Sequence, residues 1–380
     1  MLFRYLLTFG LLLFAPWTSG SYCTCNCTCP CPVLPPSPPP PTPVPTPVPT
    51  PVPTPASKWV VSASGNKLQL NGIFLNAGLF SEGLLINSRM IQGICDFSQA
   101  TPYPDTGKWD PNRNVQEFVG NMSLWKSRGL NGFTVGLQGG TPGTGGGGSN
   151  SGFNADGSLK GAWLQRLQLI LDESQRQEMI VIVSLYYVGQ IGTLGNYNNL
   201  ATGVHNVASW LQTNGYQNVI LEIANECDST GGGGIMQKLG LGSSGSNIVS
   251  LMRIAQSYGF LVGNSPKGGG FTTANLVNAS DVILIHGNGL SSAAGYTSAI
   301  RAIHQFTTYR GQPIVFNEAS SGLFLTDALS QGAGWGYYDQ GNPNYIDGYQ
   351  SPPVNWGINT ALKQAFFMRK LSLIQCILGR

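Results

Sequence analysis

Short apolar runs alternate with longer stretches of helical periodicity through most of the sequence. The apolar runs predict strands at 72–77, 131–137, 179–187, 218–225, 259–263, 281–287, 313–318 and 334–338. Four intervening stretches place apolar side chains on one helical face, at 114–129, 159–174, 297–311 and 358–374. Eight strand–helix repeats predict an α/β fold, a (β/α)8 TIM barrel that spans residues 57–380.

The main alternative is a doubly wound open sheet. Most of the predicted strands are continuously apolar, as expected for parallel strands covered on both faces. An open nucleotide-binding sheet would carry a glycine-rich phosphate turn between a strand and a helix. The glycine-rich stretches 141–152 and 229–234 do not join a strand directly to a helix in that pattern. The sequence therefore favours the barrel, with these stretches as loops at its rim.

The first 56 residues have a different composition. Residues 1–20 combine Arg4 with an apolar core shorter than the ~20 residues of a membrane span, which predicts a signal peptide, with a signal anchor as the alternative. Residues 21–31 form a Cys-rich segment, for which disulfides are predicted and metal binding is the alternative. Residues 32–56 are a Pro/Thr/Val-rich linker of polyproline II character. These features predict a secreted, extracellular protein with possible cell-wall or matrix association.

Charge and cysteine content exclude some kinds of function. The formal net charge is only +3 and no Lys/Arg run occurs, so nucleic acid is not an expected partner. Cys227 has no sequence signature of a Cys–His pair, which argues against a thiol mechanism. No cofactor and no metal are expected.

Two of the predicted strands end in the same dipeptide. Asn225-Glu226 closes the fourth strand and Asn317-Glu318 closes the seventh. Burying an ionised carboxylate without a partner is costly, and the carboxyl ends of barrel strands line the active site. Two acids three strands apart would face each other across the mouth. The alternative is that both are structural ion-pair partners of Lys or Arg.

The segment "LEIANE" (221–226) and the second strand-end glutamate resemble the cellulase-like glycoside hydrolases of clan A, of the glycosidase family five type. The resemblance covers about residues 58–375. It implies that Glu226 is the acid/base, that Glu318 is the nucleophile, and that Asn225 binds the sugar 2-hydroxyl. Such an enzyme cleaves β-glycosidic bonds with retention, and mutual repulsion of the two acids is expected to keep Glu226 protonated. The family's usual arginine and histidine near the second and third strands are missing from "VGLQGG" and "SLYYVGQ".

Other strand-end residues are candidates for contact with a polysaccharide or oligosaccharide substrate. These predicted substrate-binding residues are His286, Trp335, Tyr337, Gln138 and Tyr187. Glu222 is expected deeper in the barrel as a support. A non-catalytic carbohydrate-binding or wall-associated protein with the same barrel remains the alternative function. In a retaining enzyme the two carboxyl groups lie about 5–5.5 Å apart.

Overall fold

The structure is a computed structural model that describes residues 58–97, 100–140, 149–242, 245–320 and 322–368. The predicted signal peptide (1–20), Cys-rich segment (21–31) and linker (32–56) lie outside these residues. The two cysteines described here, Cys95 and Cys227, are buried free thiols.

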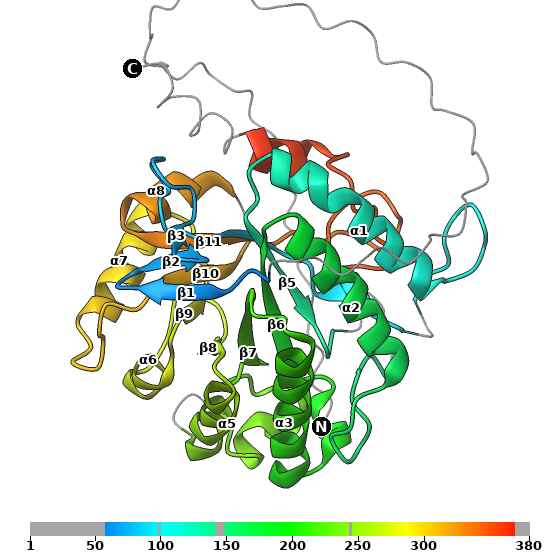
Figure 1. Cartoon of the computed structure of the whole chain (residues 1–380), viewed down its shortest axis with the longest axis horizontal. Coiled ribbons are helices and arrows are strands. Elements are labelled where there is room, and N and C mark those ends of the chain that lie inside the picture. The colour runs from blue at the N-terminus through cyan, green and yellow to red at the C-terminus, as the bar shows by residue number, and fades with distance from the viewer. Residues whose placement is uncertain (1–57, 98–99, 141–148, 243–244, 321, 369–380) are drawn as a thin grey trace, which may run out of the picture. The chain divides into compact units, whose positions relative to one another are not determined.

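Eight parallel strands form a nearly closed barrel with helices around it (Figure 1). In sequence order the strands are β4 (Ile86–Arg89), β5 (Gly132–Gly136), β6 (Ile180–Tyr187), β7 (Val219–Asn225), β8 (Leu261–Gly263), β9 (Ile283–His286), β10 (Ile314–Ala319) and β11 (Ala333–Tyr337). Strands that are neighbours in sequence pair from β4 to β8 and from β9 to β11, and β11 pairs with β4, which leaves a seam between β8 and β9. At the remaining seam, the Asp281 N–H donates to the Val262 carbonyl at 2.8 Å. The predicted TIM barrel is confirmed.

The helices bury one apolar face each, as the sequence periodicity predicts. They are α1 (Pro111–Ser127), α2 (Gly161–Arg176), α3 (Tyr197–Asn214), α4 (Gly231–Lys238), α5 (Ser246–Ser257), α6 (Ala274–Ala279), α7 (Ala293–His304) and α8 (Leu325–Ser330), with 3-10 turns η1 (Ile91–Ile94), η2 (Ile191–Leu194) and η3 (Gly322–Phe324). Residues 361–368 are also helical. In α1, Asp110 caps the first turn through the N–H groups of Asn112 and Arg113, and Phe118 and Trp125 are buried.

The first predicted strand is wrong. Within 72–77, only β3 (Ile73–Phe74) is extended, and it belongs to a small antiparallel sheet with β1 (Val61–Ser64) and β2 (Lys67–Leu70). Leu68 and Leu70 of this sheet pack with Ile180, Ile220 and other apolar residues of the barrel strands. This small antiparallel sheet therefore covers the amino-terminal end of the barrel. The true first barrel strand is β4, which sequence analysis missed.

The barrel interior changes character along the strands. Ile182, Leu284 and Val315 belong to an apolar cluster that fills the amino-terminal end of the barrel interior. Side chains alternate between the two faces of a strand, so the next inward positions are two residues further on. These positions hold Ser184, His286 and Asn317, all buried. An apolar lower layer therefore supports a polar upper layer at the carboxyl ends of the strands.

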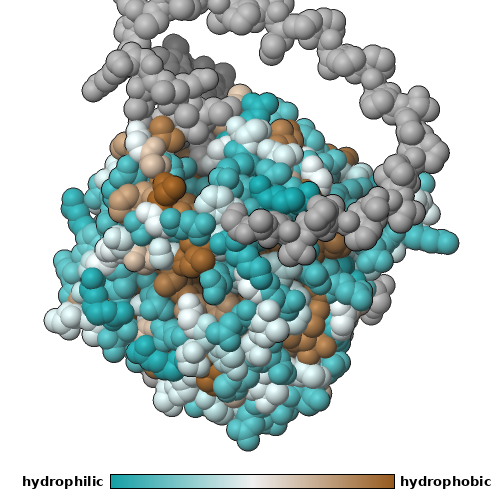
Figure 2. All heavy atoms as spheres, in the orientation of Figure 1, coloured by the Kyte–Doolittle hydropathy of each residue, from teal (hydrophilic) through white to brown (hydrophobic). Residues whose placement is uncertain are grey.

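The face of the molecule seen in Figure 2 is mostly hydrophilic. On the face seen in Figure 2, hydrophobic side chains occur in small separate groups among hydrophilic ones. No helix within the described ranges is both long and apolar enough to cross a bilayer.

Candidate active site

The two predicted acids lie together at the mouth of the barrel. Glu226 directly follows β7, and Glu318 lies near the end of β10. One carboxylate oxygen of Glu226 lies within 4.8 Å of one carboxylate oxygen of Glu318. This upper limit on the distance between the nearer oxygens is compatible with the about 5–5.5 Å that separates the carboxyl groups of retaining glycosidases. The barrel therefore brings the two predicted acids together at its mouth.

Local irregularities in the backbone direct the side chains of Glu226 and Glu318 towards the mouth of the barrel. The register of β10 shifts between Phe316 and Glu318, where strict alternation would turn Glu318 away from the inward-facing Asn317. Glu226 has φ +49°, a left-handed conformation that is uncommon for a residue with a side chain. Such irregularities tend to occur at functional sites, where surrounding structure holds them in place.

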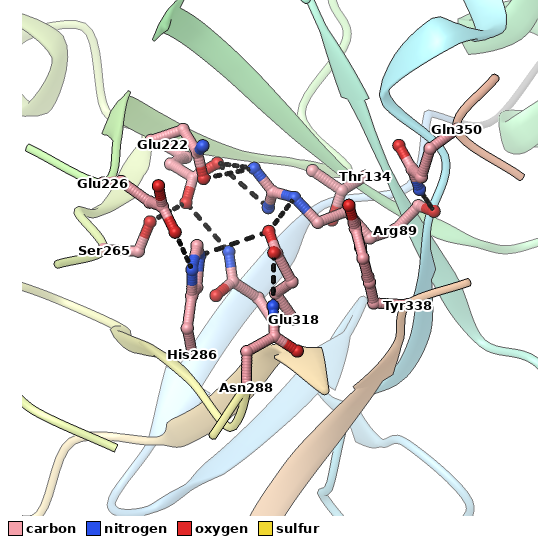
Figure 3. Close-up of polar contacts among 12 residues, drawn as sticks. Arg89, Thr134, Glu222, Glu226, Ser265, His286, Asn288, Glu318, Tyr338 and Gln350 are labelled. Carbon is pink, nitrogen blue, oxygen red and sulfur yellow. Dashed lines mark hydrogen bonds and ion pairs between the residues drawn. The ribbon is translucent and has the colours of Figure 1, made fainter. Parts of the chain in front are cut away.

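Arg89, at the end of β4, joins the acids through a buried network (Figure 3). Its Nε lies 2.8 Å from Glu318 Oε2, and its terminal nitrogens lie 3.3 Å from Glu222 Oε2. One of those nitrogens also donates to Asn225 Oδ1 at 2.6 Å. Although burial lowers the pKa of Arg89, the neighbouring carboxylates raise it above its ordinary value. The alternative of a structural ion pair is thus correct for Glu318, but the pair lies inside the candidate site.

Glu222 is the deep support that sequence analysis predicted. It is fully buried, and its Oε1 accepts hydrogen bonds from Ser265 Oγ at 2.5 Å and Asn317 Nδ2 at 2.8 Å. Burial raises its pKa, but the Arg89 charge and the hydrogen bonds outweigh this and lower it to about 2. Glu222 therefore stays ionised and fixes Arg89 beneath the two acids.

His286 lies between the two acids. Its Nδ1 is 3.5 Å from Glu226 Oε1 and its Nε2 is 3.7 Å from Glu318 Oε2, distances longer than those of ordinary hydrogen bonds. Glu318 Oε1 is held separately by Asn288 Nδ2, at 2.5 Å. The nucleophile candidate is therefore held through both of its oxygens.

The protonation expected for Glu226 is wrong for the free site. The contact with His286 is the largest influence on this carboxyl and lowers its pKa below the ordinary value, with Arg89 adding to the effect. Glu222 is the carboxylate that raises this pKa, and its effect is smaller than those of His286 and Arg89. Without a ligand, Glu226 is therefore ionised over a wider pH range than an ordinary glutamate.

This contact predicts a pH effect. If Glu226 is the general acid, kcat/KM falls as pH rises through its pKa in the free enzyme. His286→Leu removes the contact that lowers this pKa, leaves burial to raise it, and retains the smaller influences of Arg89 and Glu222. We expect the alkaline limb of the kcat/KM profile to move to higher pH. His304→Leu, in an exposed position on α7, is the matched control and should leave the limb in place. An unmoved limb in His286→Leu would contradict this assignment.

A cavity of about 230 Å³ opens above these residues. It is lined by Arg89, Ile91, Gln92, Gln138, Gly140, Ser184, Tyr187, Asn225, Glu226, Glu318, Tyr338, Gln340 and Gln350. The structure therefore places Asn225, Gln138 and Tyr187 at the cleft, where their substrate-binding roles stay predictions. Gln138 Oε1 accepts from the Tyr187 N–H at 3.0 Å, so these two wall residues are fixed together.

Three predicted substrate contacts need correction. Trp335 is 0% exposed and packs against Tyr296, with ring centroids 5.1 Å apart, because the inside–outside alternation of β11 turns it towards the helices. Tyr337 is also buried, stacked on Phe366, and its hydroxyl donates to Asp339. His286 is buried beneath the acids and does not line the cleft. Tyr338, which directly follows β11, is the aromatic residue in this region that lines the cleft.

Sequence reasoning missed the residues that complete the site. They are Arg89, Asn288, Tyr338, Gln340 and Gln350. Arg89 was not predicted because its strand, β4, was not predicted. An arginine at the carboxyl end of a barrel strand nevertheless indicates a candidate site residue. Asn288 lies two residues beyond the predicted His286, and Tyr338 directly follows Tyr337. Gln340 and Gln350 lie in the long segment after β11, which has no periodic pattern to place them.

One group of described residues has the composition of a metal site. Donor atoms of Glu226, His286 and Glu318 all lie within 4.8 Å of one another. However, the Arg89 guanidinium lies 2.8 Å from Glu318 and already supplies a positive charge there. The geometry fits a charge-balanced carboxylate pair better than a set of metal ligands.

The structure resembles those of family 5 glycoside hydrolases. A broad-specificity GH5-4 endoglucanase from Clostridium longisporum matches with a TM-score of 0.51 and 12% identity, over 76% of this chain and 97% of its own. A family 5 glycoside hydrolase from Bacteroides vulgatus gives 0.51 and 15%, over 83% of this chain and 71% of its own. The complex of a family 5 lichenase variant from Caldicellulosiruptor sp. F32 with cellotetraose gives 0.50 and 12%, over 84% and 99%.

At these identities the likeness establishes the fold. No protein-family model matches the sequence, and no curated protein sequence matches it. The resemblance to cellulase-like clan A barrels is therefore confirmed at the level of the fold.

Proposed function

We propose that this protein is a retaining glycoside hydrolase that cleaves β-glycosidic bonds in an oligosaccharide or polysaccharide. The observation that carries the proposal is the pair of strand-end carboxylates, Glu226 and Glu318, within 4.8 Å across a polar cleft. The solved structures with the same fold include an endoglucanase and a lichenase bound to cellotetraose, which supports a glycan as the ligand.

The two acids divide the chemistry between two displacements. In the first, a Glu318 oxygen bonds to the anomeric carbon, the glycosidic bond breaks, and Glu226 gives its proton to the leaving oxygen. In the second, Glu226 takes a proton from water as the water oxygen attacks the anomeric carbon, and the bond to Glu318 breaks. Each step inverts the anomeric centre, so the product retains the configuration of the substrate.

The surrounding residues prepare each acid for its role. Arg89 and Asn288 fix the two oxygens of Glu318, so the nucleophile is oriented before the sugar arrives. Asn225 uses its carbonyl oxygen for Arg89, which leaves its amide N–H groups for a sugar hydroxyl. A sugar ring above Glu226 would exclude water from this half-buried carboxyl, which favours the neutral form needed by an acid.

A substrate screen tests the proposal. Aryl β-glycosides of several sugars and β-glucan oligosaccharides should be assayed for release of the aryl group or of reducing sugar. Release from at least one class, lost in a Glu318 variant, supports the enzyme. Binding of oligosaccharides without any turnover would instead support the alternative of a non-catalytic carbohydrate-binding protein.

Removing the acid should affect substrates unequally. For Glu226→Ala we expect kcat/KM to fall about 10²–10⁴-fold on a glycoside with a poor leaving group, because no proton reaches the departing oxygen. A glycoside with a good leaving group, such as a dinitrophenolate, needs little acid help and should still form the covalent intermediate. Steady-state and burst kinetics on both substrates measure this difference. Glu82→Ala, beyond the opposite end of the barrel, is the control. Equal losses on both substrates would count against an acid/base role.

We also propose that the enzyme is exported. The support is the amino-terminal sequence: a signal-like stretch at 1–20, the Cys-rich segment at 21–31 and the Pro-rich linker at 32–56. These features suit an enzyme that meets a wall or matrix glycan outside the cell. Amino-terminal sequencing of the protein recovered from a secreting host tests this, since an uncleaved cytoplasmic product would contradict it.

A further inference from the structure

Gln350 differs from the other glutamines that line the cleft. Gln92 donates to the Gly140 carbonyl and accepts from Asn150, so both ends of its amide are used. Gln138 likewise donates to Ser151 Oγ and accepts from the Tyr187 N–H. These two side chains are part of the wall of the cleft.

The same is true of Gln340, which donates to Ser351 Oγ and accepts from the Tyr338 hydroxyl. In Gln350 the Nε2 group donates to the backbone carbonyl of Arg89 (Figure 3). No side-chain or backbone donor of the described residues is hydrogen-bonded to its Oε1. The side chain is only 5% exposed, and it lines the cleft. A largely buried residue in the cleft wall beside Arg89 therefore keeps an accepting oxygen that the protein does not use.

The chain around Gln350 is fixed by packing. The preceding residue, Tyr349, is fully buried and stacks on Trp356 with ring centroids 5.9 Å apart and an interplanar angle of 7°. The Lys363 ammonium lies 4.1 Å from the centroid of the Tyr349 ring and donates to the Asn355 carbonyl at 2.6 Å. Because its neighbour and its own Nε2 are held, Gln350 presents Oε1 in one orientation, and little conformational entropy is lost when a ligand binds.

The charges at the cleft limit the kind of ligand. The charged residues that line it are Arg89, Glu226 and Glu318. Arg89 already contacts Glu222, Glu318 and Asn225. A ligand carboxylate or sulfate would find no uncommitted cation among these lining residues and would meet two carboxylates. The cleft suits an uncharged sugar that is recognised through its hydroxyl groups.

We propose that Gln350 is a specificity-determining residue: its Oε1 accepts a hydrogen bond from one hydroxyl of the uncharged sugar bound beside Glu318. This inference rests on the proposed glycosidase function. A site built to bond a hydroxyl discriminates strongly against an analogue that lacks it, because its polar group is then left without a partner. Gln350 would therefore select sugars that present a hydroxyl at that position.

Deoxy analogues test the proposal. The best aryl β-glycoside of the substrate screen is compared with its monodeoxy analogues, each lacking one ring hydroxyl. In the wild-type enzyme, loss of the hydroxyl that Gln350 reads should lower kcat/KM about 10-fold. Gln350→Met should lose about 10-fold on the parent glycoside and show no further loss on that one analogue. Penalties for the other deoxy analogues should be unchanged.

A second variant separates recognition from support of Arg89. Gln350→Glu keeps an accepting oxygen but cannot donate to the Arg89 carbonyl, so it should still discriminate against the same analogue. Gln305→Met, at an exposed position after α7, is the matched control and should behave as wild type. Circular dichroism and thermal melting establish that each variant is folded.

Two results would overturn the proposal. One is that Gln350→Met loses activity equally on the parent and on every deoxy analogue. The other is that Gln350→Glu loses discrimination in the same way as Gln350→Met, since support of Arg89 would then explain both. Absence of turnover by the wild-type protein on every parent glycoside would be a different failure, namely that of the glycosidase function itself.

Discussion

Glu318→Gln should lower kcat by at least about 10⁴-fold while leaving the fold intact. Glutamine has nearly the same shape as glutamate, so the packing at the end of β10 is kept. Its neutral amide cannot form the covalent bond to the anomeric carbon that the double displacement needs. Arg89 would lose one of its carboxylate partners but retain Glu222, so the buried cation stays paired. Assays on the best glycoside, with thermal melting of the same preparation, measure the effect.

The control for this variant is Glu82→Gln. Glu82 pairs with Lys67, beyond the amino-terminal end of the barrel, and should tolerate the change without loss of activity. If Glu318→Gln hydrolysed the glycoside at nearly the wild-type rate, Glu318 would not be the nucleophile. If the variant failed to fold, Glu318→Asp would still test the role, because it keeps the charge and withdraws the carboxylate from the sugar.

Arg89→Met should destabilise the protein by about 3–5 kcal/mol and also abolish turnover. The substitution leaves Glu222 as a buried carboxylate without its cation, and removes a partner from Glu318 and Asn225. Arg89→Lys should recover only part of the loss, because one ammonium cannot reproduce the planar array of donors that serves three side chains. Urea-induced unfolding gives the free energy, and the glycoside assay gives the activity.

Arg301→Met provides the matched control. Arg301 is exposed on α7, where such a substitution should change the free energy of unfolding by no more than about 0.5 kcal/mol. Wild-type stability in Arg89→Met would show that the buried network does not depend on this cation. Full activity in a folded Arg89→Met protein would remove Arg89 from the account of the site.

The sequence predicted the barrel because seven of its strands are apolar runs flanked by amphipathic helices. The eighth, β4, reads Ile-Asn-Ser-Arg and was missed because its inward positions, Asn87 and Arg89, belong to the polar layer at the mouth. The apolar run at 72–77 has a stronger strand pattern, but a short apolar stretch does not show whether its strand joins the barrel or the small antiparallel sheet at its amino-terminal end.

The acids could be predicted for a related reason. A carboxylate at the end of an apolar strand is costly to bury without a partner, so the sequence alone indicates Glu226 and Glu318 as candidate site residues. Trp335 and Tyr337 were misplaced because the face that a strand residue occupies depends on register, which the sequence does not give. The pKa of Glu226 could not be predicted because His286 and Arg89 approach it from other strands.

The most direct test of the double displacement is to trap its covalent intermediate. An activated 2-deoxy-2-fluoro glycoside of the sugar that the enzyme hydrolyses fastest slows both steps, and its good leaving group lets the intermediate accumulate. Mass spectrometry of a proteolytic digest then locates the added sugar. We expect one glycosyl group per protein, attached to Glu318. A sugar attached to another residue, or no attachment by an enzyme that hydrolyses the parent glycoside with inversion, would contradict it.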